Sequence, residues 1–272
     1  MAFCAALAVI ALATFTALRA TSSAARLLYP YGSENDTFNK NEDDGTSALI
    51  ELYSNITLFG NVSSSLYVNN NGLLSFKAPI SVFTPKDLPV ADGNPFLAVF
   101  WADIDNVIAG NISYWQSNEL SLLNQATSDV RSYFSLPSFS AALVFVATWH
   151  GVAYYGSSAS SSMVNTFQAV LCSNGNLTFI MFNYESILWT TGTSSGGNNK
   201  GTGGTQALAG VNSGYQTGYY KIPGSLSEDM INISSTSNVN VTGRWVFRVD
   251  KLHPEDASGI IGDVEKCKKY LC

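Results

Sequence analysis

The feature that most constrains the fold is a long succession of short segments rich in β-branched and aromatic residues, separated by Gly, Asn, Ser and Pro, from about Leu27 to Asp250. This spacing is typical of a sandwich or barrel-like β domain. No internal repeat of about 20 to 50 residues accompanies it, so a solenoid or propeller is not expected. The sequence predicts a mainly β fold, an antiparallel β-sandwich-like domain.

Ten segments carry the residue types and the alternation expected of strands. They are Ala48–Leu58, Leu66–Asn69, Leu73–Lys77, Phe96–Trp101, Asn111–Gln116, Ala141–Trp149, Asn165–Leu171, Leu177–Tyr184, Ala207–Val211 and Arg244–Val249. Asn-Gly pairs occur at 71–72 and 174–175, and the second lies between two alternating apolar runs. That pair predicts a hairpin turn.

Two segments depart from the β pattern. Between Asn118 and Tyr133, apolar residues recur at three- and four-residue spacing behind a candidate N-cap at Ser117 or Asn118, which predicts one amphipathic helix packed on a sheet. The segment Thr190–Thr205 is rich in Gly, Ser, Thr and Asn and has little apolar surface to bury, so we expect a mobile loop.

Both ends differ from the central region. Residues 1–25 hold an apolar run followed by Arg19 and small residues, which predicts a secretory signal peptide cleaved after Ala20, Ala24 or Ala25. Residues 251–272 form a short charged tail that contains cysteines and is interpreted as the start of a truncated cysteine-rich module. The domain itself is therefore placed at residues 26–250, in a chain that leaves the cell.

Composition restricts the partners. The net charge of −6 and the absence of clustered Lys/Arg from the body of the chain argue against a nucleic-acid partner. No apolar stretch long enough to span a membrane follows the signal. Seven Asn-x-Ser/Thr sequons are candidate glycosylation sites: Asn35, Asn55, Asn61, Asn111, Asn176, Asn232 and Asn240.

Three cysteines remain after signal removal: Cys172, Cys267 and Cys272. All three are disulfide candidates, but an odd number in a secreted chain implies an unpaired thiol or a partner outside this sequence. A disulfide-linked or homo-oligomeric assembly is one expectation. The alternative for Cys172 is a buried free thiol.

Candidates for catalysis are few. The segment Gly192–Gly196 matches G-x-S-x-G with Ser194 in the middle, but a low-complexity loop follows it where a helix is required. Only His150 and His253 could act as its base. The glycines around Lys200 lack the Gly-Lys-Ser/Thr order of a phosphate loop. No catalytic site and no enzyme activity are predicted.

Metal binding has two candidates. The segment from Glu42 to Gly45 resembles part of an EF-hand loop, but Lys40 would occupy the first ligand position. Asp103 and Asp105 lie two residues apart at a strand end, so both carboxylates could face one side and share Ca²⁺. A turn in which they hydrogen-bond their own backbone is the alternative. Apart from this possible calcium, no cofactor is expected.

Nine blocks follow one another along the chain: Leu27–Gly32, Asp43–Ser47, Leu66–Phe76, Phe100–Asp105, Ala147–Val152, Asn165–Leu171, Phe179–Tyr184, Ala209–Asn212 and Gly243–Val249. In this order they resemble the NIDO domain, the extracellular domain of nidogen and alpha-tectorin, and the alpha-tectorin-like branch is nearer. The resemblance covers about residues 27–250.

The resemblance implies a secreted, non-catalytic module of the extracellular matrix that functions in matrix assembly and cell–matrix adhesion. It would act through contacts with matrix or cell-surface proteins. The alternative is a lectin-like module in which Trp115, Tyr154 and Tyr155 stack on sugars and Asp103 or Asp105 holds Ca²⁺. Calcium-dependent glycan binding would distinguish the two.

Overall fold

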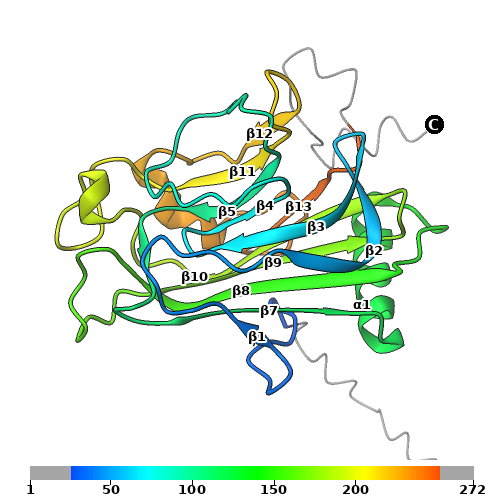
Figure 1. Cartoon of the computed structure of the whole chain (residues 1–272), viewed down its shortest axis with the longest axis horizontal. Helices are drawn as coiled ribbons and strands as arrows, with labels where there is room; N and C mark the ends of the chain where they lie inside the picture. Colours follow the sequence, from blue (N-terminus) through cyan, green and yellow to red (C-terminus); the bar gives the residue numbers. More distant parts are fainter. Residues whose placement is uncertain (1–25, 252–272) are drawn as a thin grey trace, which may run out of the picture.

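The alternating segments pair into two antiparallel sheets in the computed structural model, which describes residues 26–251 (Figure 1). The first sheet has the order β1 (Thr37–Phe38), β7 (Asn111–Ser117), β8 (Leu143–Tyr154), β9 (Asn165–Ser173), β10 (Thr178–Ser186) and β13 (Arg244–Arg248), with β6 (Ile104–Asp105) paired to β8. The second has the order β12 (Tyr219–Lys221), β11 (Leu208–Asn212), β5 (Phe96–Trp101), β4 (Leu73–Ser75), β3 (Asn61–Asn69) and β2 (Ile50–Leu58).

The mainly β, antiparallel prediction is confirmed, and each of the ten predicted segments overlaps a strand. The hairpin at Asn174–Gly175 is also confirmed, because Ser173 of β9 pairs with Thr178 of β10 and Gly175 has a φ of 93°. Strands β1, β6 and β12 were not predicted. They are only two or three residues long, too short to show an alternating pattern.

The main core lies between the sheets and is rich in aromatic residues. Trp149 of β8 stacks on Phe167 of β9 with ring centroids 5.1 Å apart. The polar atoms of these side chains join the layers: the Trp149 indole donates to the carbonyl of Asn70, and the Tyr184 hydroxyl donates to that of Val99. Buried aromatic groups are thus hydrogen-bonded as well as packed.

Helix α1 (Leu120–Phe134) covers the outer face of the first sheet, as predicted. Its buried residues Ala126, Val130 and Phe134 recur every four positions and face β8, β9 and β10. The N-cap differs from the prediction: Glu119 occupies it without a side-chain cap, and the Ser117 hydroxyl accepts the N–H of Glu119 instead. The helix therefore depends on its packing more than on its cap.

The prediction that the Gly/Ser/Thr-rich segment Thr190–Thr205 is a mobile loop is wrong, because this segment is ordered. The N–H groups of Thr190 and Thr191 both donate to the carbonyl of Gly201, and that of Thr205 donates to Ser195. The segment includes the one-turn helix η1 (Thr193–Ser195). Backbone hydrogen bonds and close contacts between glycines hold it in place, so it orders without the apolar burial that the sequence argument required.

Short helix η2 (Glu228–Ser235) precedes β13 and packs on β10. Among residues 26–251, no helix has the length and apolar character needed to cross a membrane. The predicted signal peptide, His253 and the cysteine-containing tail lie outside the described residues.

A buried polar network attaches the first described residues to the sandwich. The Gln168 side chain accepts the N–H of Tyr29 at 2.8 Å and donates to its carbonyl at 3.0 Å, as a neighbouring strand would. The Arg244 guanidinium donates to the carbonyl of Leu27 and to the Tyr133 hydroxyl. Since Tyr29 also donates to Asp129 of α1, this network joins the N-terminal segment, the helix and the first sheet.

We expect Gln168→Leu to lower the free energy of unfolding by about 2–4 kcal/mol, because it leaves the buried N–H and carbonyl of Tyr29 without partners. Urea denaturation measures this change. The control is Gln125→Leu at an exposed position of α1, which should shift the value by less than about 0.5 kcal/mol. Equal effects of the two substitutions would contradict the role given to the Gln168 amide.

Candidate functional site

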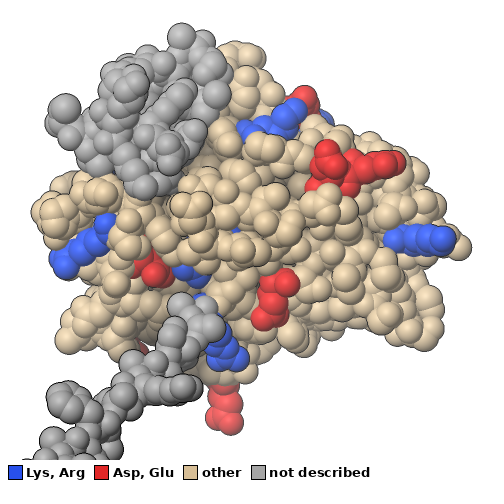
Figure 2. Space-filling model, turned by 180° about the vertical axis from the view of Figure 1, so that it is seen from behind, with Lys and Arg blue, Asp and Glu red and all other residues tan. Residues whose placement is uncertain are grey.

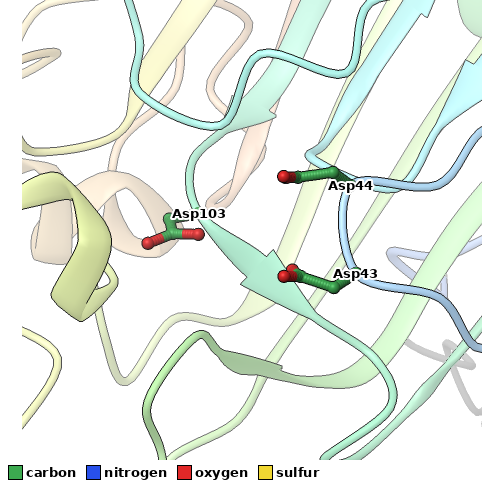
Figure 3. Close-up of side chains that lie close together, drawn as sticks. All are labelled: Asp43, Asp44 and Asp103. Atoms are coloured by element: carbon green, nitrogen blue, oxygen red, sulfur yellow. The ribbon is translucent and has the colours of Figure 1, made fainter.

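Three aspartates from two loops converge at one end of the sandwich. Asp43 and Asp44 lie between β1 and β2, and Asp103 lies between β5 and β6. Each offers a carboxylate oxygen within 4.8 Å of the others. Figure 3 shows the side chains of Asp43 and Asp44 directed toward Asp103. We call these three residues the carboxylate cluster.

Asn71 joins the two loops of the cluster. Its side-chain nitrogen donates to the Asp44 carboxylate at 2.6 Å, and its side-chain oxygen accepts the N–H of Ile104 at 3.0 Å. The next residue, Gly72, has a φ of 85°, and a Cβ there would lie 2.0 Å from the carbonyl oxygen of Phe100. Glycine is therefore required for β5 to approach the turn that carries Asn71.

Asp103 is almost completely buried, with 2% of its surface exposed. Burial, followed by the charges of Asp43 and Asp44, raises its pKa to about 6, although backbone N–H groups of Ser194 and Ser195 oppose the rise. Burial and the charges of Asp44 and Asp105 likewise raise the pKa of Asp43 to about 6. Asp103 is the buried member of the cluster, whereas Asp44 is half-buried and Asp43 is exposed, so solvent screens part of the repulsion among the three carboxylates.

The described part of the chain provides no cationic side chain to this cluster. The ion pairs found among the described residues lie elsewhere: Lys221 with Asp87, Arg244 with Asp129 and Arg248 with Asp250. Asp103 is the buried carboxylate of the three, and buried charges in proteins are normally paired or bound to a metal. Three carboxylates are ligands of the type that Ca²⁺ prefers.

The structure separates the roles of the two aspartates singled out from the sequence. Asp103 belongs to the cluster, whereas Asp105 lies in β6 and its carboxylate accepts the N–H of Val107 at 2.9 Å. The acidic pair Asp43–Asp44 belongs to the segment that departs from the EF-hand pattern, so that pattern does not identify the pair as ligands. Its association with Asp103 depends on contacts between distant segments, which spacing does not reveal.

The candidate hydrolase residues have other partners. Ser194 lies in η1, and its N–H donates to the Asp103 carboxylate at 3.1 Å. The Nδ1 atom of His150 lies 3.1 Å from the Tyr31 hydroxyl. The G-x-S-x-G segment forms a short turn inside a loop and not the strand-to-helix turn of a nucleophile elbow.

The aromatic residues considered for sugar stacking are in different environments. Tyr154 is buried, and its hydroxyl donates to the carbonyl of Asn199. Trp115 is half-buried and donates to the carbonyl of Pro30. Tyr155 is exposed, and its N–H donates to the carbonyl of Asp103. They do not form one stacking surface, because Tyr154 is enclosed.

The remaining candidates divide by exposure. All seven sequon asparagines are exposed.

Cys172 is a free thiol in β9, completely buried in the core under α1, and burial raises its pKa above the ordinary value. The other two cysteines lie outside residues 26–251. On the face shown in Figure 2, most of the surface is uncharged and the charged side chains form a few small groups.

The fold and the carboxylate cluster together define the class of protein. It is an antiparallel β-sandwich module with a cluster of carboxylates at one end. Residues 64–251 match the family described as "NIDO: Nidogen-like domain". The chain belongs to this nidogen-like domain family, whose members alpha-tectorin and nidogen are secreted structural proteins of the extracellular matrix.

The chain is 45% identical to alpha-tectorin of Mus musculus over 90% of its length and 47% identical to that of Homo sapiens over 86%. It is 32% identical to nidogen of Drosophila melanogaster over 78% of its length. It covers 11% of each of those alpha-tectorins and 16% of that nidogen. No solved structure matches it. Identity is higher to these alpha-tectorins than to this nidogen, as the resemblance implied.

The raised pKa values predict a pH dependence. Because the folded state holds protons on Asp103 and Asp43 more tightly than the unfolded chain, stability should fall as pH rises from about 4 to about 6. Asp103→Asn should weaken this fall and raise the free energy of unfolding at neutral pH by on the order of 1 kcal/mol. Urea denaturation at several pH values measures both. The exposed control Asp92→Asn should follow the unsubstituted protein, and an unchanged profile for Asp103→Asn would contradict the prediction.

Proposed function

We propose that this chain is a secreted, non-catalytic module of the extracellular matrix that acts through contacts with matrix or cell-surface proteins. The observation that carries the proposal is its membership of a family of structural matrix proteins. Residues 26–250 would be the contact module, between a signal peptide at 1–25 and the charged tail at 251–272. The different environments of Ser194 and His150 support a function without catalysis.

Charge and thiol chemistry support the same function. Only 12% of the residues are charged, so association with a partner would depend on shape more than on long-range electrostatic steering. Because Cys172 is buried, a disulfide to another chain would use Cys267 or Cys272. Burial also disfavours the reactive thiolate form of Cys172.

The test is retention of the full chain in matrix deposited by the cells that secrete it. We expect most of the secreted chain in the matrix fraction, and we expect the Ser194→Ala variant to be retained equally. If disulfides contribute, Cys267→Ser/Cys272→Ser should lower retention and remove disulfide-linked species from non-reducing gels, whereas Cys172→Ala should do neither.

A co-secreted control of similar size that has no matrix affinity gives the background. Recovery of the chain in the medium at the level of this control would contradict the proposed function.

The second candidate is calcium binding, favoured by the carboxylate cluster and its lack of a cationic side chain among the described residues. Asp43, Asp44 and Asp103 would supply the ligands, with Asp105 adding negative charge nearby. Bound Ca²⁺ would join the loop before β2 to the turn after β5. It would thereby rigidify this end of the module.

Calcium at about 1 mM, the range of extracellular calcium modules, should raise the Tm of the full chain at pH 7. The rise should shrink at pH 5, because protons then compete for Asp43 and Asp103. Asp103→Asn and Asp44→Ala should each abolish it, and Asp92→Asn should not. A Tm that is independent of calcium would eliminate this candidate and, with it, calcium-dependent glycan binding.

A further inference from the structure

The outer face of the first sheet carries an extended segment in addition to helix α1. This segment is residues Leu27–Tyr31, which we call the N-terminal strap. It is held by side chains from four strands, and these are Arg244 of β13, Gln168 of β9, Trp115 of β7 and His150 of β8. The strap therefore crosses the sheet and ends over β7 and β8.

Asn111, the sequon asparagine of β7, lies on this outer face beside the end of the strap. It pairs with His150 of β8, and the pairing of the two strands continues to Ser117 without a register shift. Directly opposite residues of an antiparallel pair point to the same face. Since His150 contacts Tyr31 of the strap, the Asn111 side chain also points to the outer face.

An apolar aromatic side chain flanks Asn111 on its other side. Ser113, two residues after Asn111, pairs with Phe38 of β1, and residues two apart in a strand share a face. Phe38 is therefore a diagonal neighbour of Asn111 in the next strand, within the reach of an aromatic side chain. Phe38 is 50% exposed, and β1 is the edge strand of the sheet. An uncovered phenyl ring thus lies beside this sequon.

The ring on the β8 side is accessible as well. His150 is exposed, and its ring centroid lies 5.4 Å from that of the half-buried Tyr31. Its Nδ1 atom lies 3.1 Å from the Tyr31 hydroxyl. Because Asn111 is itself exposed, its amide opens to solvent between Phe38 and the pair formed by His150 and Tyr31.

This environment distinguishes Asn111 from the other sequon asparagines. Of the seven, it is the one whose strand is paired on both sides without a register shift. Asn55 and Asn61 belong to the β2–β3 pair, which contains a shift, and the remaining four lie outside strands: Asn35, Asn176, Asn232 and Asn240. At Asn111 the strand pairing therefore fixes which side chains an attached sugar would meet.

We propose that Asn111 carries an N-linked oligosaccharide whose first sugar packs against Phe38 and His150 and thereby stabilises the attachment of β1 and of the N-terminal strap. The donor is a polyprenyl diphosphate-linked oligosaccharide. The amide nitrogen Nδ2 forms a bond to C1 of the first sugar, the bond from C1 to the diphosphate breaks with its electron pair on the diphosphate, and the amide loses one proton. The C–H groups of a sugar ring then pack on the negative faces of the aromatic rings.

The first experiment compares the full chain secreted by a glycosylating cell line with two variants. Asn111→Gln should lose the mass of one glycan and lower the Tm by about 2–4 °C, the change expected for one lost aromatic contact in a domain of this size. The matched control is Asn232→Gln, which removes an exposed sequon in η2, outside both sheets. It should change the Tm less than half as much.

The second experiment tests whether the sugar acts through Phe38. Phe38→Ala should lower the Tm of the glycosylated chain but have little further effect in Asn111→Gln, because the effects of groups in contact are not additive. The control is Val82→Ala, at an apolar position that is 44% exposed. It should have the same effect in both backgrounds.

If Asn111→Gln is not secreted, the unsubstituted protein is trimmed by an endoglycosidase that leaves one sugar per site, which should leave the Tm unchanged. Complete removal of the glycans should then lower the Tm of the unsubstituted protein more than that of Phe38→Ala.

Three outcomes would overturn the proposal: an unchanged mass of Asn111→Gln, equal shifts in Tm for Asn111→Gln and Asn232→Gln, or additive effects of Phe38→Ala and Asn111→Gln. The proposal requires secretion, as the proposed function does, but both experiments use protein recovered from the medium. Their outcomes are therefore independent of matrix retention and calcium binding.

Discussion

The long irregular segments of this chain bury backbone N–H and carbonyl groups, and each of these groups needs a hydrogen-bond partner. The rest of the structure depends on meeting this requirement. In this chain, neutral side-chain amides supply many of them. Gln168 pairs with Tyr29, Asn165 accepts the N–H groups of Leu188 and Trp189, and Asn238 exchanges two hydrogen bonds with Val246. Each amide presents a donor and an acceptor in the geometry of a peptide group, so it can take the place of a missing strand.

This use of amides explains how a chain with so few charges can bury so much irregular backbone. A buried amide carries no net charge, so its desolvation cost is lower than that of an ion pair. Four charged residues of the described chain are nevertheless buried, Asp103, Asp105, Arg244 and Asp250, and the surroundings of Arg244 and Asp103 differ most. Hydrogen bonds surround the guanidinium of Arg244, whereas the carboxylates of Asp43 and Asp44 repel that of Asp103.

The parts of the fold that could be predicted from the sequence are those encoded locally. Alternation in segments such as Asn165–Leu171, the Asn174–Gly175 turn and the spacing of Ala126 and Val130 each report a nearby structure. The carboxylate cluster could be predicted only in part, because Asp103 meets Asp43 through a turn that Asn71 fixes from a third segment. The glycine-rich segment was interpreted wrongly because composition does not show hydrogen bonds within a loop.

Both ends of the described chain, residues 26–251, are attached close to strand β13, and this arrangement has a mechanical consequence. Leu27 contacts Gly243 and Arg244 at the start of β13, whereas the described chain ends just after the finish of the same strand, where Val249 and Asp250 accept the N–H groups of Phe59 and Gly60. Tension applied to the two ends would act along β13. The antiparallel pairing of β13 with β10 would then be loaded in shear, so its hydrogen bonds would resist the force together and would not open one after another.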